Sequence, residues 1–200
     1  MNERAVAAKA ASLLLRYPDP EVLAALPAVV AALDELPGRL ATPLAAVAAH
    51  RAAADPIRLA AEYVETFDFR RRCALHLTYY THGDTRARGP ALAGFAAAYR
   101  AAGLAVTGGE LPDYLPAVLD LAAAHGSGWD LLGGHRVGLD LLVSALERDR
   151  SVYAHAVRAV RLLLPPPTPA DLAAAAGLAR GGPPVERVGL QPYTPTGGRP

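Results

Sequence analysis

The apolar residues of this chain recur at helical spacing, and this pattern constrains its fold more than any other feature of the sequence. No convincing run of alternating β-branched residues, of the kind that forms a half-buried strand, accompanies it. A helix with one apolar face must bury that face against other helices. The sequence therefore predicts an all-α fold, a single-domain bundle of about seven to nine helices joined by short connections.

Several helix starts are marked by a capping residue followed by proline. Such a pair places an oxygen acceptor at the N-cap and a preset φ at the first helical position. The pairs are Asp19-Pro20, Thr42-Pro43 and Asp55-Pro56. Pro27 lacks a backbone donor and is expected to kink its helix. The predicted helices span residues 3–16, 20–36, 43–54, 56–67, 90–102, 111–125, 129–147 and 151–164.

The composition changes at Pro165. Nine of the eighteen prolines lie at or beyond this point, together with two Gly-Gly pairs. Such a segment cannot bury enough apolar surface to offset the entropy of ordering it. We therefore expect a helical domain over residues 1–164 and a flexible Pro/Gly-rich tail over residues 165–200. Within the tail, residues 169–180 could form one short helix.

Composition and charge exclude several classes of protein. The net charge of +1 argues against a nucleic-acid binder, which usually has a strong basic excess. A single cysteine, Cys73, excludes an internal disulfide and any cysteine-based metal site made by this chain alone. No segment reaches the roughly 18 uninterrupted apolar residues of a membrane span, and the start lacks the pattern of a signal peptide. We expect a cytoplasmic protein without direct membrane insertion.

The segment Phe67–Gly89 concentrates residue types that are rare elsewhere in the chain. It contains three consecutive arginines, the cysteine, two of the six histidines, two adjacent tyrosines and a Gly-Asp pair. A catalytic site, a nucleic-acid surface and a protein-binding surface are the three interpretations to weigh.

The catalytic interpretation rests on Cys73 and His76, one helical turn apart. A thiol beside a base can act as a nucleophile, but free cysteine is more often a small buried apolar residue. The histidines form no HxxxH or HExxH pattern, and neither a P-loop nor GxGxxG occurs. We therefore expect no catalytic residue, no metal site and no cofactor held by the chain itself.

The nucleic-acid interpretation rests on the Arg70–Arg72 cluster, with Arg86 and Arg88 nearby. Arginines next to Tyr79 and Tyr80 could contact phosphates and stack on bases. The neighbouring acidic residues Glu62, Glu65, Asp68 and Asp84 offset much of this charge. A nucleic-acid-binding helical regulator is therefore kept as the alternative function.

The third interpretation is a groove between helices that binds an amphipathic segment of another protein. Tyr79, Tyr80 and Tyr114 could supply aromatic anchors, and Glu110 and Asp113 an acidic rim. The same tyrosines could equally be core residues whose hydroxyl groups reach the backbone. Spacing alone does not separate the two possibilities.

Two stretches of the chain resemble a known family. They are "YVETFDFRRRCALHLTYYTHGDTRARGPALAGFAAAYRAAG", Tyr63–Gly103, and "ELPDYLPAVLDLAA", Glu110–Ala123. With "LLRYPD" near the start, they resemble the NarJ-type nitrate reductase molybdenum-cofactor assembly chaperones, within the TorD/DmsD group of redox-enzyme maturation proteins. The resemblance ends at about Leu164.

The resemblance implies an all-helical cytoplasmic chaperone without catalytic activity. Its implied partner is the apo catalytic (alpha) subunit of a membrane-bound molybdoenzyme, the respiratory nitrate reductase, together with cofactor-insertion proteins. The chaperone would bind the N-terminal segment of that subunit and hold it competent for molybdenum-cofactor and iron–sulfur insertion before membrane docking. It would be absent from the final enzyme.

By motif match, the implied client-binding residues lie in two signature segments. We expect Phe67–Gly89 to form a helix end and a loop that face the ELPDYLP helix start across a groove. The residues are Tyr79, Tyr80, His82, Asp84, Glu110, Pro112, Asp113, Tyr114 and Leu115.

Overall fold

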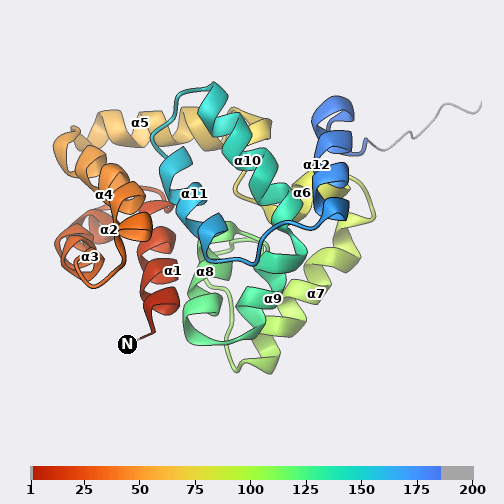
Figure 1. Cartoon of the computed structure of the whole chain (residues 1–200), viewed down its shortest axis with the longest axis horizontal. Helices are drawn as coiled ribbons and strands as arrows, with labels where there is room; N and C mark the ends of the chain where they lie inside the picture. The colour runs from red at the N-terminus through yellow and green to blue at the C-terminus, as the bar shows by residue number, and fades with distance from the viewer. Residues whose placement is uncertain (1, 186–200) are drawn as a thin grey trace, which may run out of the picture.

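The computed structural model describes residues 2–185 and is all-helical (Figure 1). Twelve α-helices and one 3-10 helix form a single domain, and no strand occurs among the described residues. The predicted fold class is confirmed, with more helices than the seven to nine expected. None of the helices described is both long and apolar enough to cross a membrane.

The N-terminal half of the bundle follows the predicted caps in part. Asp19 accepts a hydrogen bond from Val22 N at 2.8 Å, and Asp55 accepts from Ile57 N at 3.1 Å, so both pairs start helices as expected. The helices of this half are α1 (Glu3–Leu14), α2 (Pro20–Ala24), α3 (Leu26–Leu33), α4 (Gly38–Ala53) and α5 (Pro56–Phe67).

Two predictions in this half are wrong. Residues 20–36 form two helices, because the chain breaks at Ala25 and Pro27 lies in the first turn of α3. Thr42-Pro43 is not a helix start, since α4 begins at Gly38 and contains Pro43. The buried stripe of α4 begins at Leu40, so packing favours a helix that starts one turn earlier than the cap pattern indicates.

The C-terminal half has more and shorter helices than predicted. The segment expected as a helix end and a loop contains both η1 and α6, and the helix predicted over 129–147 is two helices divided at His135, after Gly133 and Gly134. The elements are η1 (Arg71–Cys73), α6 (Leu77–His82), α7 (Arg88–Ala101), α8 (Leu115–Ala124), α9 (Ser127–Gly134), α10 (Arg136–Arg148), α11 (Ala154–Leu162) and α12 (Pro169–Gly181).

The core is organised around α1. This helix packs against α3 and α4 on one side and against α8 and α11 on the other. Its alanines at positions 7, 8, 10 and 11 are buried, and such small side chains let the neighbouring helices approach closely. The end of α1 is thereby placed beside the start of α8.

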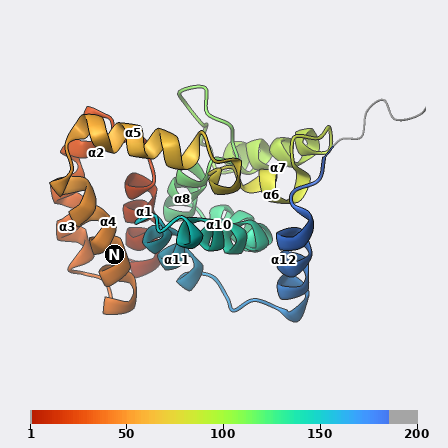
Figure 2. The same cartoon turned by 90° about the horizontal axis from the view of Figure 1, so that it is seen from above.

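The last described helix, α12, has a capping box formed by Thr168 and Asp171 and packs against α10. It lies at the opposite end of the molecule from α2, α3 and α4 (Figure 2). The predicted flexibility of residues 165–200 stays a prediction, and residues 186–200 lie outside the described part of the chain.

Candidate functional site

The ELPDYLP segment is held against the chain that precedes α6. Leu77 N donates to Asp113 O at 3.1 Å, and Leu115 N donates to Leu75 O at 2.7 Å. These bonds form an isolated antiparallel bridge between His76 and Tyr114. Residues 111–114 make a turn, so α8 begins at Leu115 rather than at the predicted residue 111.

Asp113 is the polar centre of this junction, and its side chain is fully buried. Its carboxylate accepts hydrogen bonds from Thr78 N at 3.1 Å, His76 Nδ1 at 3.2 Å and Arg88 Nη2 at 3.4 Å. Burial favours the protonated acid, but the hydrogen bonds from His76 and Thr78 outweigh it and lower the pKa of Asp113 to about 2. Asp113 is therefore an ionised structural link between α6, α7 and the start of α8.

Tyr114 lies on the opposite side of the turn and is half-buried. Tyr63 donates its hydroxyl proton to Leu15 O at 2.9 Å, so the Tyr114 hydroxyl donates to Tyr63 Oη at 3.0 Å. Burial raises the pKa of Tyr114, so its hydroxyl stays protonated at neutral pH. This chain of hydrogen bonds ties Tyr114 to the end of α1.

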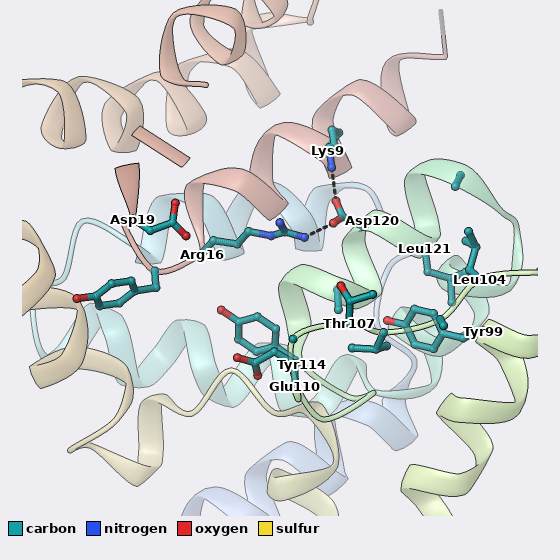
Figure 3. A pocket seen from close by; sticks show the side chains of 16 residues that line it. Lys9, Arg16, Asp19, Tyr99, Leu104, Thr107, Glu110, Tyr114, Asp120 and Leu121 are labelled. Carbon is teal, nitrogen blue, oxygen red and sulfur yellow. Dashed lines mark hydrogen bonds and ion pairs between the residues drawn. The ribbon is translucent and has the colours of Figure 1, made fainter. Parts of the chain in front are cut away.

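Two adjoining cavities open beside Tyr114. The larger, of about 530 Å³, lies between α1, α8 and the loop that follows α7 (Figure 3). The smaller, of about 280 Å³, extends toward the end of α5. Both are lined by Tyr17, Glu110 and Tyr114, and we call the two together the α1–α8 groove.

The charges of the α1–α8 groove are divided between its two ends. In the larger cavity, Asp120 accepts hydrogen bonds from Lys9 Nζ at 2.9 Å and from Arg16 (Figure 3). Glu110 and Asp68 are exposed, and neither forms an ion pair with any described residue. Asp19 lines the larger cavity and accepts the cap hydrogen bond from Val22 N, without an ion pair to any described residue. The uncompensated charge of the groove is therefore negative, and two of its three carboxylates, Asp68 and Glu110, line the smaller cavity.

The structure brings two of the nine predicted binding residues into this groove, Glu110 and Tyr114. Pro112 is half-buried in the turn, while Asp113 and Leu115 are fully buried. Asp113 therefore does not form the acidic rim that we expected from the sequence. The turn exposes Glu110 and points the Asp113 carboxylate inward, where three segments supply its donors.

The predicted residues in and just after α6 line neither cavity of the groove. Tyr80 is a core residue whose hydroxyl donates to Ala74 O at 2.9 Å, which decides between its two interpretations. Tyr79 packs edge-on against Tyr80 and lines neither cavity. His82 Nδ1 bonds with Thr81 Oγ1 at 2.8 Å, and the exposed Asp84 pairs with Arg71 at 3.1 Å.

Sequence reasoning missed several residues that line the groove. Tyr17 follows the end of α1, Tyr63 and Asp68 belong to α5 and its C-cap, and Tyr99 is near the end of α7. All four lie in stretches that resemble the family, Tyr17 in "LLRYPD" and the others in Tyr63–Gly103, but nothing in the sequence marked them as groove residues.

Specific contacts argue against the nucleic-acid and catalytic interpretations of Phe67–Gly89. Each arginine of the cluster is ion-paired within the chain, Arg70 and Arg72 with Asp149 at 3.1 Å and 2.7 Å, and Arg71 with Asp84. Burial raises the pKa of Cys73 to about 11, and His76 bonds to Asp113 rather than to the thiol. Cys73 is therefore not an activated nucleophile.

Comparisons with known proteins agree with this architecture. The model of the family "Nitrate reductase delta subunit" matches residues 30–158. The chain is 34% identical over 156 residues to the "Probable nitrate reductase molybdenum cofactor assembly chaperone NarJ" of Bacillus subtilis, which covers 76% of this chain and 85% of that protein. It is 42% identical over 152 residues to the nitrate reductase-like protein NarX of Mycobacterium tuberculosis, 75% of this chain.

The chain spans only 23% of the length of that NarX protein. Among solved structures, a redox enzyme maturation protein from Archaeoglobus fulgidus has the same fold, with a TM-score of 0.58 and 23% identity over 81% of this chain and 93% of that one. The family model spans well over half of the sequence. The chain therefore belongs to the nitrate reductase delta subunit family of NarJ-type proteins.

Proposed function

We propose that this protein is an assembly chaperone for the catalytic (alpha) subunit of a respiratory nitrate reductase. It acts in the cytoplasm and binds the N-terminal segment of that subunit in the α1–α8 groove. The bound subunit stays competent for insertion of the molybdenum cofactor and an iron–sulfur cluster, by the cofactor-insertion proteins, until it docks at the membrane. The chaperone then leaves and is not part of the final enzyme.

The names of the relatives support the assembly role, since the Bacillus subtilis protein is named as a molybdenum cofactor assembly chaperone. The observation that carries the binding role is the open groove beside the ELPDYLP segment. Two apolar or aromatic side chains of its lining are exposed, Tyr17 and Leu104, with 45% and 42% of their surface accessible. Exposed apolar residues gathered at one groove are typical of a protein-binding surface.

An amphipathic helix is the segment that such a groove fits best, because its apolar face can lie against these side chains while its polar face stays in water. The client must leave after maturation, so the affinity should be moderate. We expect a dissociation constant between micromolar and tens of nanomolar, or a binding free energy of about −8 to −10 kcal/mol.

Calorimetric titration tests this function. The full chain is titrated with a synthetic peptide that copies the N-terminal segment of the nitrate reductase catalytic subunit from the same cells. Tyr114→Ala should weaken binding about tenfold, because an aromatic anchor at the centre of an interface contributes more than its rim. Tyr114→Phe keeps the ring and should retain most of the affinity.

Phe69→Ala is the matched control, since Phe69 is 78% exposed and lines neither cavity of the groove. Thermal unfolding of each variant verifies that it is folded. A peptide that does not bind the wild-type chain would contradict the proposed function. Equal affinity of wild type and Tyr114→Ala would place the binding surface elsewhere.

A further inference from the structure

The smaller cavity of the α1–α8 groove differs in chemistry from the larger one. It is lined by four aromatic rings, Tyr17, Tyr63, Phe67 and Tyr114, and by two carboxylates. We propose that this cavity is a subsite for one cationic side chain, an arginine or a lysine, of the client segment. The proposal rests on the proposed function and specifies which kind of residue anchors the client.

The aromatic rings form a connected wall. The Tyr17 ring lies edge-on to Tyr63 with the ring centres 5.5 Å apart, and the Tyr63 and Phe67 rings are 4.7 Å apart. The faces of aromatic rings attract a guanidinium or ammonium group that lies within about 6 Å of the ring centre. The wall also packs well against the aliphatic stem of such a side chain.

The carboxylates of Asp68 and Glu110 add the charge that selects a cation. Both are exposed and make no ion pair with any residue in the described part of the chain. The one basic group in the lining, His76, is already bonded to Asp113 at 3.2 Å. The nearby Arg16 pairs with Asp120, and Arg51 is buried with its Nη1 bonded to backbone carbonyls.

The cavity is preformed and large enough for this occupant. Its volume of about 280 Å³ equals that of about nine water molecules in the liquid, which leaves room for a guanidinium group and its stem. The hydroxyl groups of Tyr63 and Tyr114 are bonded to each other and to Leu15 O, so the wall is fixed before the client arrives. Little conformational entropy is then lost on binding, which favours affinity.

A cationic anchor at one end would also set the register of the client. Its apolar residues would lie in the larger cavity, where Lys9 and Arg16 already neutralise Asp120. Asp68 lines only the smaller cavity and Glu110 lines both, whereas Asp19, the other carboxylate of the larger cavity, already accepts the cap hydrogen bond from Val22 N. One basic residue of the client should therefore matter much more than the others.

The test is a double-mutant cycle between chain and peptide, measured by calorimetry at low salt. In the peptide, each Lys or Arg is replaced in turn by Gln. In the chain, Asp68→Asn and Glu110→Gln should each weaken binding of the unmodified peptide about threefold, and the double variant about tenfold. The same variants should bind the peptide that lacks the anchoring cation as the wild type does.

Glu35→Gln is the matched control, because Glu35 is an exposed carboxylate in the turn after α3, outside the groove. It should leave every affinity unchanged. If the double variant binds the unmodified peptide as tightly as the wild type does, the subsite is refuted while the proposed function stands. Equal losses of affinity for all peptides would also refute the subsite, because the carboxylates would then attract the peptide only through their long-range charge. A peptide that fails to bind the wild-type chain refutes the proposed function itself.

Discussion

Asp113 joins three segments of the chain through one buried carboxylate. It is bonded to Thr78 at the start of α6, to Arg88 at the start of α7 and to His76 in the preceding bridge. The donors around this buried carboxylate stabilise its ionised form more than its protonated form. Its pKa of about 2 therefore links the ionisation of one residue to the stability of the site.

Acid titration of the wild type tests this link. The folded-state pKa of Asp113 lies below its unfolded value near 3.8, so the extra stability is present above pH 4 and is lost as the pH falls toward 2. The contribution at neutral pH is about 2 kcal/mol. Asp113→Asn should be less stable by at least this amount at pH 7, measured by urea unfolding.

The difference between Asp113→Asn and the wild type should shrink between pH 4 and pH 2, because the variant has no carboxyl group to titrate at this position. Asp34→Asn is a suitable control, since the carboxylate of Asp34 is exposed and forms no ion pair with any residue in the described part of the chain. A constant difference over this range would show that Asp113 does not titrate in the folded state.

At the scale of elements, the end of α1 is capped by two other helices. The last carbonyls of a helix lack partners within it. Arg51 of α4 donates from Nη1 to Leu14 O at 2.6 Å and to Arg16 O at 3.0 Å, and Tyr63 of α5 donates to Leu15 O. A positive charge also complements the dipole at this end of the helix. The arrangement holds Arg16 and Tyr17 at the groove.

Replacement of Arg51 tests the importance of this cap. Arg51→Met should lower the free energy of unfolding by about 2–4 kcal/mol, because it leaves buried carbonyls without donors. Arg51→Lys should recover part of the loss, since an ammonium group can still donate to one or two of them. Denaturant unfolding of both variants provides the comparison. Wild-type stability of Arg51→Met would show that the carbonyls find other donors.

At the scale of the whole molecule, the groove is formed where both halves of the bundle meet. Its walls come from α1 and α5 of the first half and from α8 and the α7–α8 loop of the second. A ligand bound at such a junction stabilises the folded chain as one unit, because unfolding of either half destroys the site.

Scanning calorimetry with the client peptide measures this effect. At a free peptide concentration about 100 times the dissociation constant, binding should add about 2.7 kcal/mol of stability. For a chain of this length, Tm should rise by about 5–10 °C. The peptide with its sequence scrambled is the control and should leave Tm unchanged. An equal shift with both peptides would indicate non-specific binding.

The sequence predicted the fold better than it predicted the site. The helical class and the caps at Asp19 and Asp55 could be predicted, because helical periodicity and capping depend on residues close in sequence. The start of α4 could not, because it depends on the packing of Leu40 in the core. The division at His135 follows the Gly133–Gly134 pair, a local helix-weakening signal that the prediction passed over.

The sequence alone determined that the chain is a helical bundle and that its distinctive motifs are those of the family now identified. Only the tertiary structure decided that Glu110 and Tyr114 face a groove, whereas Asp113 and Tyr80 are buried. The physical reason is the separation in sequence of the residues that interact. A helix is specified by neighbours three and four residues apart, whereas the groove joins Tyr17, Asp68 and Tyr114, which meet only when distant helices pack together.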